Sequence, residues 1–141
     1  MKWLLLLAAG LPFATAADLK SVQAEPNLER RSERALDYAS EVLTNLRTDL
    51  ESKDWSKVAI ELADFRAGVD LSVGSLKSTG KTARRNPKYF KKAEVRLREL
   101  GRRLKGLQLL LHVDDRTKMD DLMDYVDQVQ DELVNLTMGV R

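Results

Sequence analysis

Residues 86–112 read NPKYFKKAEVRLRELGRRLKGLQLLLH, and this stretch decides the fold. Its apolar residues follow one another in steps of three and four. They are Phe90, Ala93, Leu97, Leu100, Leu104, Leu107 and Leu111. Because an α-helix has 3.6 residues per turn, this spacing places all seven on one face. A continuous apolar face has to be buried, so the stretch predicts a helix that packs against other helices.

Three other segments repeat this period, and the last of them carries a coiled-coil heptad face. The predicted helices cover residues 26–52, 54–76, 87–112 and 115–138. The first and third connections are short and favour antiparallel neighbours, whereas the linker at residues 77–86 is longer. We therefore expect an all-α fold. Its architecture would be an antiparallel up-down-up-down four-helix bundle of two helical hairpins, formed by residues 26–141.

Prolines and capping residues mark the expected starts of the helices. Pro26 and Pro87 suit the first position of a helix, where a missing N–H costs no hydrogen bond. Asp54 and Asn86 can accept hydrogen bonds from first-turn N–H groups, as can an aspartate of the connection at 113–115.

Glycines interrupt two of the predicted helices. Between Gly68 and Gly74 the apolar residues alternate as in a strand, but a single strand would have no pairing partner, so a helix is the better prediction. Gly101 and Gly106 leave two interpretations open: close approach of a neighbouring backbone, or no structural role.

The first sixteen residues have the three parts of a bacterial-type signal peptide. Lys2 precedes an apolar run, and Ala14-Thr15-Ala16 provides small residues for cleavage after position 16. An uncleaved anchor is disfavoured because Gly10 and Pro12 interrupt the run. We expect residues 1–16 to be removed, residues 17–25 to form a flexible leader, and the protein to be exported to the periplasm or secreted.

The mature chain is expected to have no transmembrane helix and no lipid anchor. No other stretch approaches the roughly 20 apolar residues that span a bilayer. Without any Cys the chain can form neither a disulfide nor a lipobox.

The composition argues against catalysis and against a cofactor. The chain has one His, no Cys and no recognisable nucleotide-binding or hydrolase motif. His112 with nearby aspartates is a poor metal site, and haem ligands at His112 and Met119 would lie at the same bundle end. We expect no enzyme, no metal and no cofactor.

Charge is strongly segregated along the chain. Residues 84–105 contain ten basic side chains and two acidic ones, whereas residues 114–138 contain eight acidic and two basic ones. In heptad register, only Arg96 and Arg103 are expected to reach an acidic partner such as Glu132 across a helix seam. The remaining basic residues should stay open to solvent or to a ligand.

These residues are the candidate anion-binding set. The set comprises Arg84, Arg85, Lys88, Lys91, Lys92, Arg98, Arg102 and Lys105. Several of them lie at a helix N-terminus, which itself attracts anions. The expected partners are an anionic envelope lipid, a polysaccharide or an acidic protein, and nucleic acid is disfavoured by the export signal. A solvated face that only keeps the bundle soluble is the competing interpretation.

The sequence therefore predicts a small exported helical protein that acts by non-catalytic binding or structural interaction. A periplasmic chaperone or stress-response protein is the alternative, and it would need an exposed apolar concavity. A homodimer is a further expectation, because Leu71, Leu109 and Leu110 fall outside the main apolar stripes.

Overall fold

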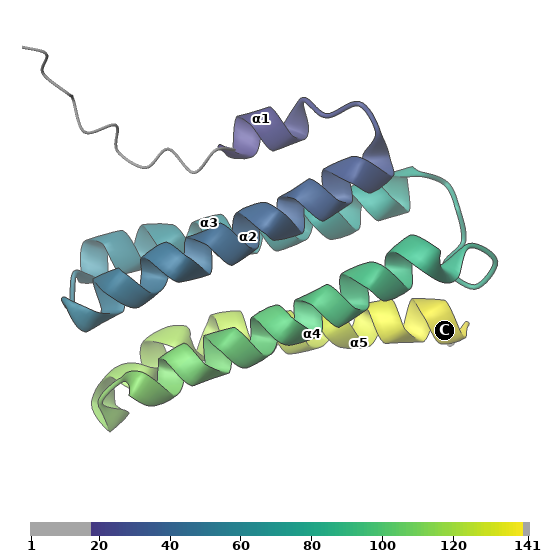
Figure 1. The fold of residues 1–141 in the computed structure, drawn as a ribbon. Helices are drawn as coiled ribbons and strands as arrows, with labels where there is room; N and C mark the ends of the chain where they lie inside the picture. The colour runs from purple at the N-terminus through teal and green to yellow at the C-terminus, as the bar shows by residue number, and fades with distance from the viewer. Residues whose placement is uncertain (1–17, 140–141) are drawn as a thin grey trace, which may run out of the picture.

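The structure is a computed structural model that describes residues 18–139. Four long helices form two layers, with α2 and α3 in one and α4 and α5 in the other (Figure 1). The helices are α1 (Leu19–Gln23), α2 (Leu28–Glu51), α3 (Trp55–Ser78), α4 (Pro87–Leu110), the 3-10 helix η1 (Val113–Met119) and α5 (Asp120–Met138). The described chain is thus all-helical and consistent with a helical bundle. The predicted signal peptide, residues 1–16, lies outside the described residues.

The helix starts follow the predicted local chemistry only in part. Asp54 caps α3 by accepting from the Lys57 N–H at 3.3 Å, and Pro87 is the first residue of α4, as predicted. Helix α2 begins after Asn27, whose side chain accepts from the Arg30 N–H at 2.9 Å. The prediction of Pro26 as its first residue was therefore wrong. A 3-10 turn, not an aspartate cap, precedes α5.

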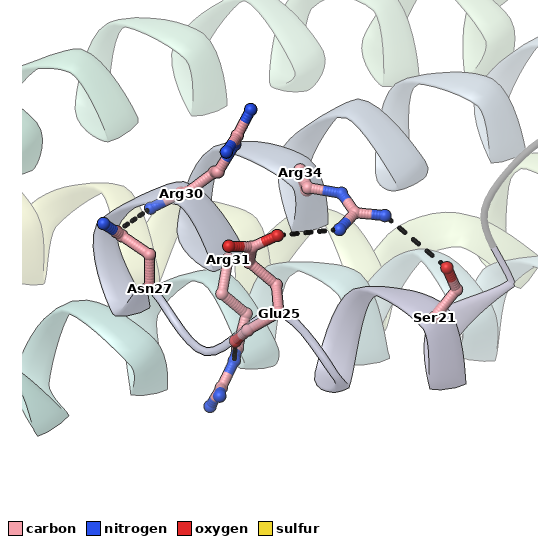
Figure 2. A network of polar contacts seen from close by, with 6 residues as sticks. All are labelled: Ser21, Glu25, Asn27, Arg30, Arg31 and Arg34. Atoms are coloured by element: carbon pink, nitrogen blue, oxygen red, sulfur yellow. Dashed lines mark hydrogen bonds and ion pairs between the residues drawn. The ribbon is translucent and has the colours of Figure 1, made fainter.

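The segment expected to be a flexible leader is ordered from Asp18 onward. Helix α1 forms there and its Val22 is fully buried. The Glu25 carboxylate accepts from Arg34 at 3.1 Å, and the Glu25 carbonyl accepts from the Arg31 Nε at 2.8 Å (Figure 2). One helical turn is too short to produce a detectable apolar period, so this docking could not be predicted from the sequence.

Helices α2 and α3 form an antiparallel hairpin with a very close approach. A Cβ placed on Gly68 would lie 3.2 Å from the Ala35 carbonyl oxygen and 3.3 Å from the Ala39 Cβ. Nearby, the buried hydroxyls of Ser32 and Ser72 are 2.8 Å apart. Small residues therefore allow the two backbones to approach. The segment with strand-like alternation is helical up to Ser78, which confirms the preference for a helix.

The two hairpins stack so that helices running in the same direction face each other. Lys92 contacts Glu33 and Arg103 contacts Thr44, and both pairs join α4 to α2 with the same separation of 59 residues. A constant separation of contacting residues is the mark of parallel neighbours. The linker between Ser78 and Pro87 crosses from α3 to the start of α4, which is why it is longer than the other connections.

Helix α3 faces α5 through polar and aromatic contacts. The Tyr125 hydroxyl donates to the Asp70 carboxylate, and the Arg66 guanidinium lies 4.1 Å from the centre of the Tyr125 ring. Lys77 forms an ion pair with Glu132 at the other end of the same seam. Burial raises the pKa of Asp70, and the charge of Arg66 opposes that rise.

Helices α4 and α5 form the second antiparallel hairpin. The buried Gln108 amide donates to Asp120 at 2.8 Å and to the Arg116 carbonyl at 2.9 Å. A Cβ on Gly101 would lie 3.3 Å from a methyl of Val126, whereas Gly106 is open. The close neighbour of Gly101 is thus a side chain.

The core runs along the whole bundle. Among its fully buried side chains are Phe65, Leu46, Leu104 and Leu133, one from each long helix. None of the helices between Asp18 and Gly139 combines the length and the hydropathy that crossing a bilayer requires.

Candidate anion-binding surface

The candidate residues belong to α4 and to the end of the linker before it. Apolar residues of α4 point into the core, so its charged residues are distributed over the sides and the outer surface of the helix. The structure divides the eight candidates according to how far each is already engaged within the chain.

Two candidates form strong ion pairs. The Lys92 ammonium lies 2.7 Å from a carboxylate oxygen of Glu33, and Arg98 lies 2.6 Å from both carboxylate oxygens of the nearly buried Glu94. Hydrogen bonding to Glu33 raises the pKa of Lys92, and hydrogen bonding to Glu94 raises that of Arg98. Their charges are therefore partly neutralised inside the molecule.

The two arginines expected to reach α5 contact α2 instead. Arg96 pairs with Asp37 at 2.6 Å, and Arg103 donates to the Ser40 hydroxyl at 2.6 Å. Glu132, their expected partner, pairs with Lys77 of α3. The prediction that Arg96 and Arg103 reach Glu132 was wrong, because the side of α4 that carries these two arginines faces the parallel helix α2.

Two more candidates, Arg84 and Lys105, lie close to other residues of the chain. A Cβ on Gly139, the residue that ends α5, would lie only 3.0 Å from the Arg84 side chain. This position suits a cation, because the C-terminal end of a helix is its negative end. Lys105 donates to the Gln108 side chain at 3.2 Å and otherwise stays exposed.

The remaining candidates are exposed: Arg85, Lys88, Lys91 and Arg102. Within residues 18–139 none of the four lies within ion-pair distance of a carboxylate. Three of them, Arg85, Lys88 and Lys91, gather where α4 begins, and we refer to these three as the basic end. Lys88 also lies 5.3 Å from the centre of the Tyr89 ring.

A hollow of about 310 Å³ lies beside the basic end. Lys88 and Lys91 line it together with Tyr89 and the start of the helix. One carboxylate, that of Glu29, also lines the hollow, and it forms an ion pair with Lys81, which lines the hollow too. Hydrogen bonding to Glu29 raises the pKa of Lys81. The hollow is therefore bordered by an excess of positive charge.

The helix start adds backbone donors to this charge. The Asn86 side chain makes no capping hydrogen bond, although the sequence predicted one. Pro87 has no N–H, so the first-turn N–H groups of Lys88 and Tyr89 are left without a side-chain acceptor. Uncapped N–H groups, the positive end of the helix dipole and nearby cations are the components of an anion site.

A carboxyl group on the other layer was missed by sequence reasoning. Glu61 of α3 lines a hollow of about 250 Å³ between α2 and α3. Burial raises the pKa of Glu61 to about 8, with further contributions from a hydrogen bond to Asp49 and from the charges of Asp49 and Asp64. The sequence could not indicate this, because nothing local shows that Asp49 and Glu61 face each other across the hairpin.

His112, the only histidine of the chain, lies before η1. His112 accepts from the Asp114 N–H at 3.4 Å and so caps η1. In the described range, no group of three or more His, Asp and Glu side chains is placed to hold a metal ion.

Comparison with known proteins adds no family. No family model, curated protein sequence or solved structure matches the chain.

Proposed function

We propose that this protein is an exported, non-catalytic helical protein whose basic end binds an anionic component of the cell envelope. The observation that carries the proposal is the start of α4, where three cations, without a carboxylate partner among residues 18–139, lie at or just before a helix N-terminus that has no side-chain cap. The predicted signal peptide supports the location, and a phosphorylated lipid is the envelope component that best fits this chemistry.

The energetics of the basic end also support this proposal. Cations near the N-terminus of a helix destabilise it by about 0.3–1 kcal/mol each at low salt. Lys88 and Lys91 lie in the first turns of α4, and Arg85 lies just before it. An arrangement that lowers stability without an internal benefit is typical of a binding site.

The alternative chaperone role has weaker support. The exposed large apolar side chains are distributed over α3, α4, α5 and η1. These side chains are Ile60, Val95, Leu109, Leu110, Val113, Leu136 and Met138. A chaperone that holds unfolded chains needs these groups in one concave surface.

A matched pair of variants tests the proposal. R85Q/K88Q/K91Q removes three charges from the basic end, and R47Q/K53Q/K57Q removes three from the opposite end of the bundle. Both are compared with the wild type on vesicles of phosphatidylcholine with and without phosphatidylglycerol, and on immobilised heparin, at two salt concentrations.

We expect the basic-end variant to lose at least tenfold in affinity for the anionic vesicles, and the control to keep it. Binding by the wild type should weaken with salt. Equal losses in both variants would leave only net charge as the cause and contradict the proposal. Retention on heparin without vesicle binding would assign the site to an anionic polysaccharide.

A further inference from the structure

The outer face of the α4–α5 hairpin carries opposite charges on its two helices. Helix α4 presents Arg98, Arg102 and Lys105, and α5 presents Asp120, Asp124, Asp127 and Asp131. Steps of three and four residues place each set in one stripe along its helix. All seven side chains are exposed. We refer to this surface as the α4–α5 outer face.

The orientation of this face follows from the contacts of the two helices. Lys92 and Arg96 mark the side of α4 that meets α2, and Tyr125 and Glu132 mark the side of α5 that meets α3. The two charged stripes lie on neither of these sides and not in the core. They therefore point away from the α2–α3 layer.

The stripes do not neutralise each other within the chain. Between Asp18 and Gly139 no ion pair joins α4 to α5, and the carboxylate partner of Arg98 is Glu94 of its own helix. Arg98 is therefore partly neutralised, and Arg102 and Lys105 are the cations of the α4 stripe that remain available beside the acidic stripe.

Apolar side chains accompany the stripes. A hollow of about 270 Å³ between α4 and α5 is lined by Val95, Val134 and Met138. Val95 is 48% exposed and Met138 is 69% exposed. Leu109, which is 54% exposed, continues the stripe of Arg102 and Lys105 towards the end of α4. Exposed apolar anchors between charged residues are typical of a protein interface.

We propose that a second copy of this chain docks on the α4–α5 outer face, related by a twofold axis that lies in the interface parallel to the helices. The charged residues that carry the proposal lie on α5 and in the C-terminal half of α4, and the hollow beside them is also lined by Lys91 of the basic end. If another partner occupies this face in place of a second copy, the wild type should be monomeric in the test below.

The charge pattern selects this axis. A twofold axis parallel to the helices places α4 on α5 of the partner subunit, and α5 on its α4, so opposite charges meet twice. A twofold axis across the helices would place α4 on α4 and α5 on α5, and like charges would face each other. Like charges in contact repel each other, so this second arrangement is disfavoured.

The axial positions of the charges also agree. Gly101 lies level with Val126, and Gln108 lies level with Asp120. Rotation about an axis parallel to the helices does not move a residue along them. The cations at positions 98–105 therefore arrive level with positions 122–130 of the second copy, which include Asp124 and Asp127.

Sedimentation equilibrium of the purified protein tests the interface. We expect the wild type to be a dimer at low ionic strength and to dissociate as salt is raised. R102E/K105E and D124K/D127K should each raise the dissociation constant at least tenfold. The control K20E/K53E, with two exposed cations on other elements reversed, should stay dimeric. A wild type that is monomeric at every concentration would overturn the proposal.

The charge-swapped chain R102E/K105E/D124K/D127K distinguishes the symmetry. With the axis parallel to the helices its stripes are again complementary, so the dimer should be restored. A swapped chain that remains monomeric, while circular dichroism shows it folded, would overturn the proposed arrangement. Dimers that persist in R102E/K105E would place the interface elsewhere. The substitutions at Arg102, Lys105, Asp124 and Asp127 leave Arg85, Lys88 and Lys91 unchanged, so a variant that loses the dimer but still binds vesicles separates the two proposals.

Discussion

Replacing Gly68 by alanine tests the close approach of α2 and α3. In a helix exposed to solvent, glycine to alanine stabilises by about 1 kcal/mol, because alanine loses less backbone entropy. At Gly68 the added Cβ would lie 3.1 Å from a ring carbon of Tyr38, 3.2 Å from the Ala35 carbonyl oxygen and 3.3 Å from the Ala39 Cβ. The Tyr38 ring can rotate, but the backbone of Ala35 and the Cβ of Ala39 move only if the helices separate.

Overpacking of this kind costs about 1–3 kcal/mol. We therefore expect Gly68→Ala to be neutral to about 2 kcal/mol less stable than the wild type. Gly74 is the matched control, because it lies in the same helix and an added Cβ meets nothing within 4 Å. Gly74→Ala should stabilise by about 1 kcal/mol, through helix propensity alone.

Urea unfolding followed by circular dichroism at the helix band provides the measurement. The difference in unfolding free energy between the two variants removes the propensity effect and leaves the steric cost of the hairpin contact. A Gly68→Ala variant as stable as Gly74→Ala, with an unchanged dependence on urea, would show that the backbones do not approach as described.

Two further predictions concern the α2–α3 hairpin. Because burial and Asp49 raise the pKa of Glu61 to about 8, the folded state retains a proton that the unfolded state loses near pH 4.5. The free energy of unfolding should therefore fall as pH rises from 4.5 to about 8. Glu61→Gln should reduce this fall by about 1–2 kcal/mol, a value that allows for solvent screening. Urea unfolding midpoints across this pH range measure the change in stability. An equal dependence of the midpoint on pH in the wild type and in Glu61→Gln would contradict the prediction. Lys53, in the turn that ends α2, has a φ of 54°, a left-handed conformation that glycine adopts more easily than lysine. Lys53→Gly should therefore raise the unfolding free energy by about 0.5–1 kcal/mol. A lower thermal midpoint for this variant would refute the prediction.

The interhelical ion pairs mark where sequence reasoning failed. A heptad assigns Arg96 and Arg103 to the side of a helix, but it cannot say which helix stands on that side. The sequence offered acids on both candidate neighbours, with Asp37 on α2 and Glu132 on α5. Electrostatic attraction between exposed side chains amounts to roughly 0–1 kcal/mol, too little to choose between two arrangements. The choice depends on how the apolar faces fit.

The candidate site was predictable in part. Sequence position alone places Lys88 and Lys91 at the start of a helix, because Pro87 marks that start. The engagement of Lys92 by Glu33 and of Arg98 by Glu94 could not be read in advance. The first pair joins residues that are distant in the chain, and the second depends on the burial of Glu94.

The sequence by itself determined that this chain is helical and where most helices begin and end. The apolar period, Pro87 and Asp54 act within a few residues, so their effect is independent of the rest of the fold. Only the tertiary structure decided the stacking of α4 on α2, the contact at Gly68 and the docking of α1 through Val22. These features join residues that are far apart in the chain. They depend on the shapes of side chains and on the distances between backbones, and a period of 3.6 residues specifies neither.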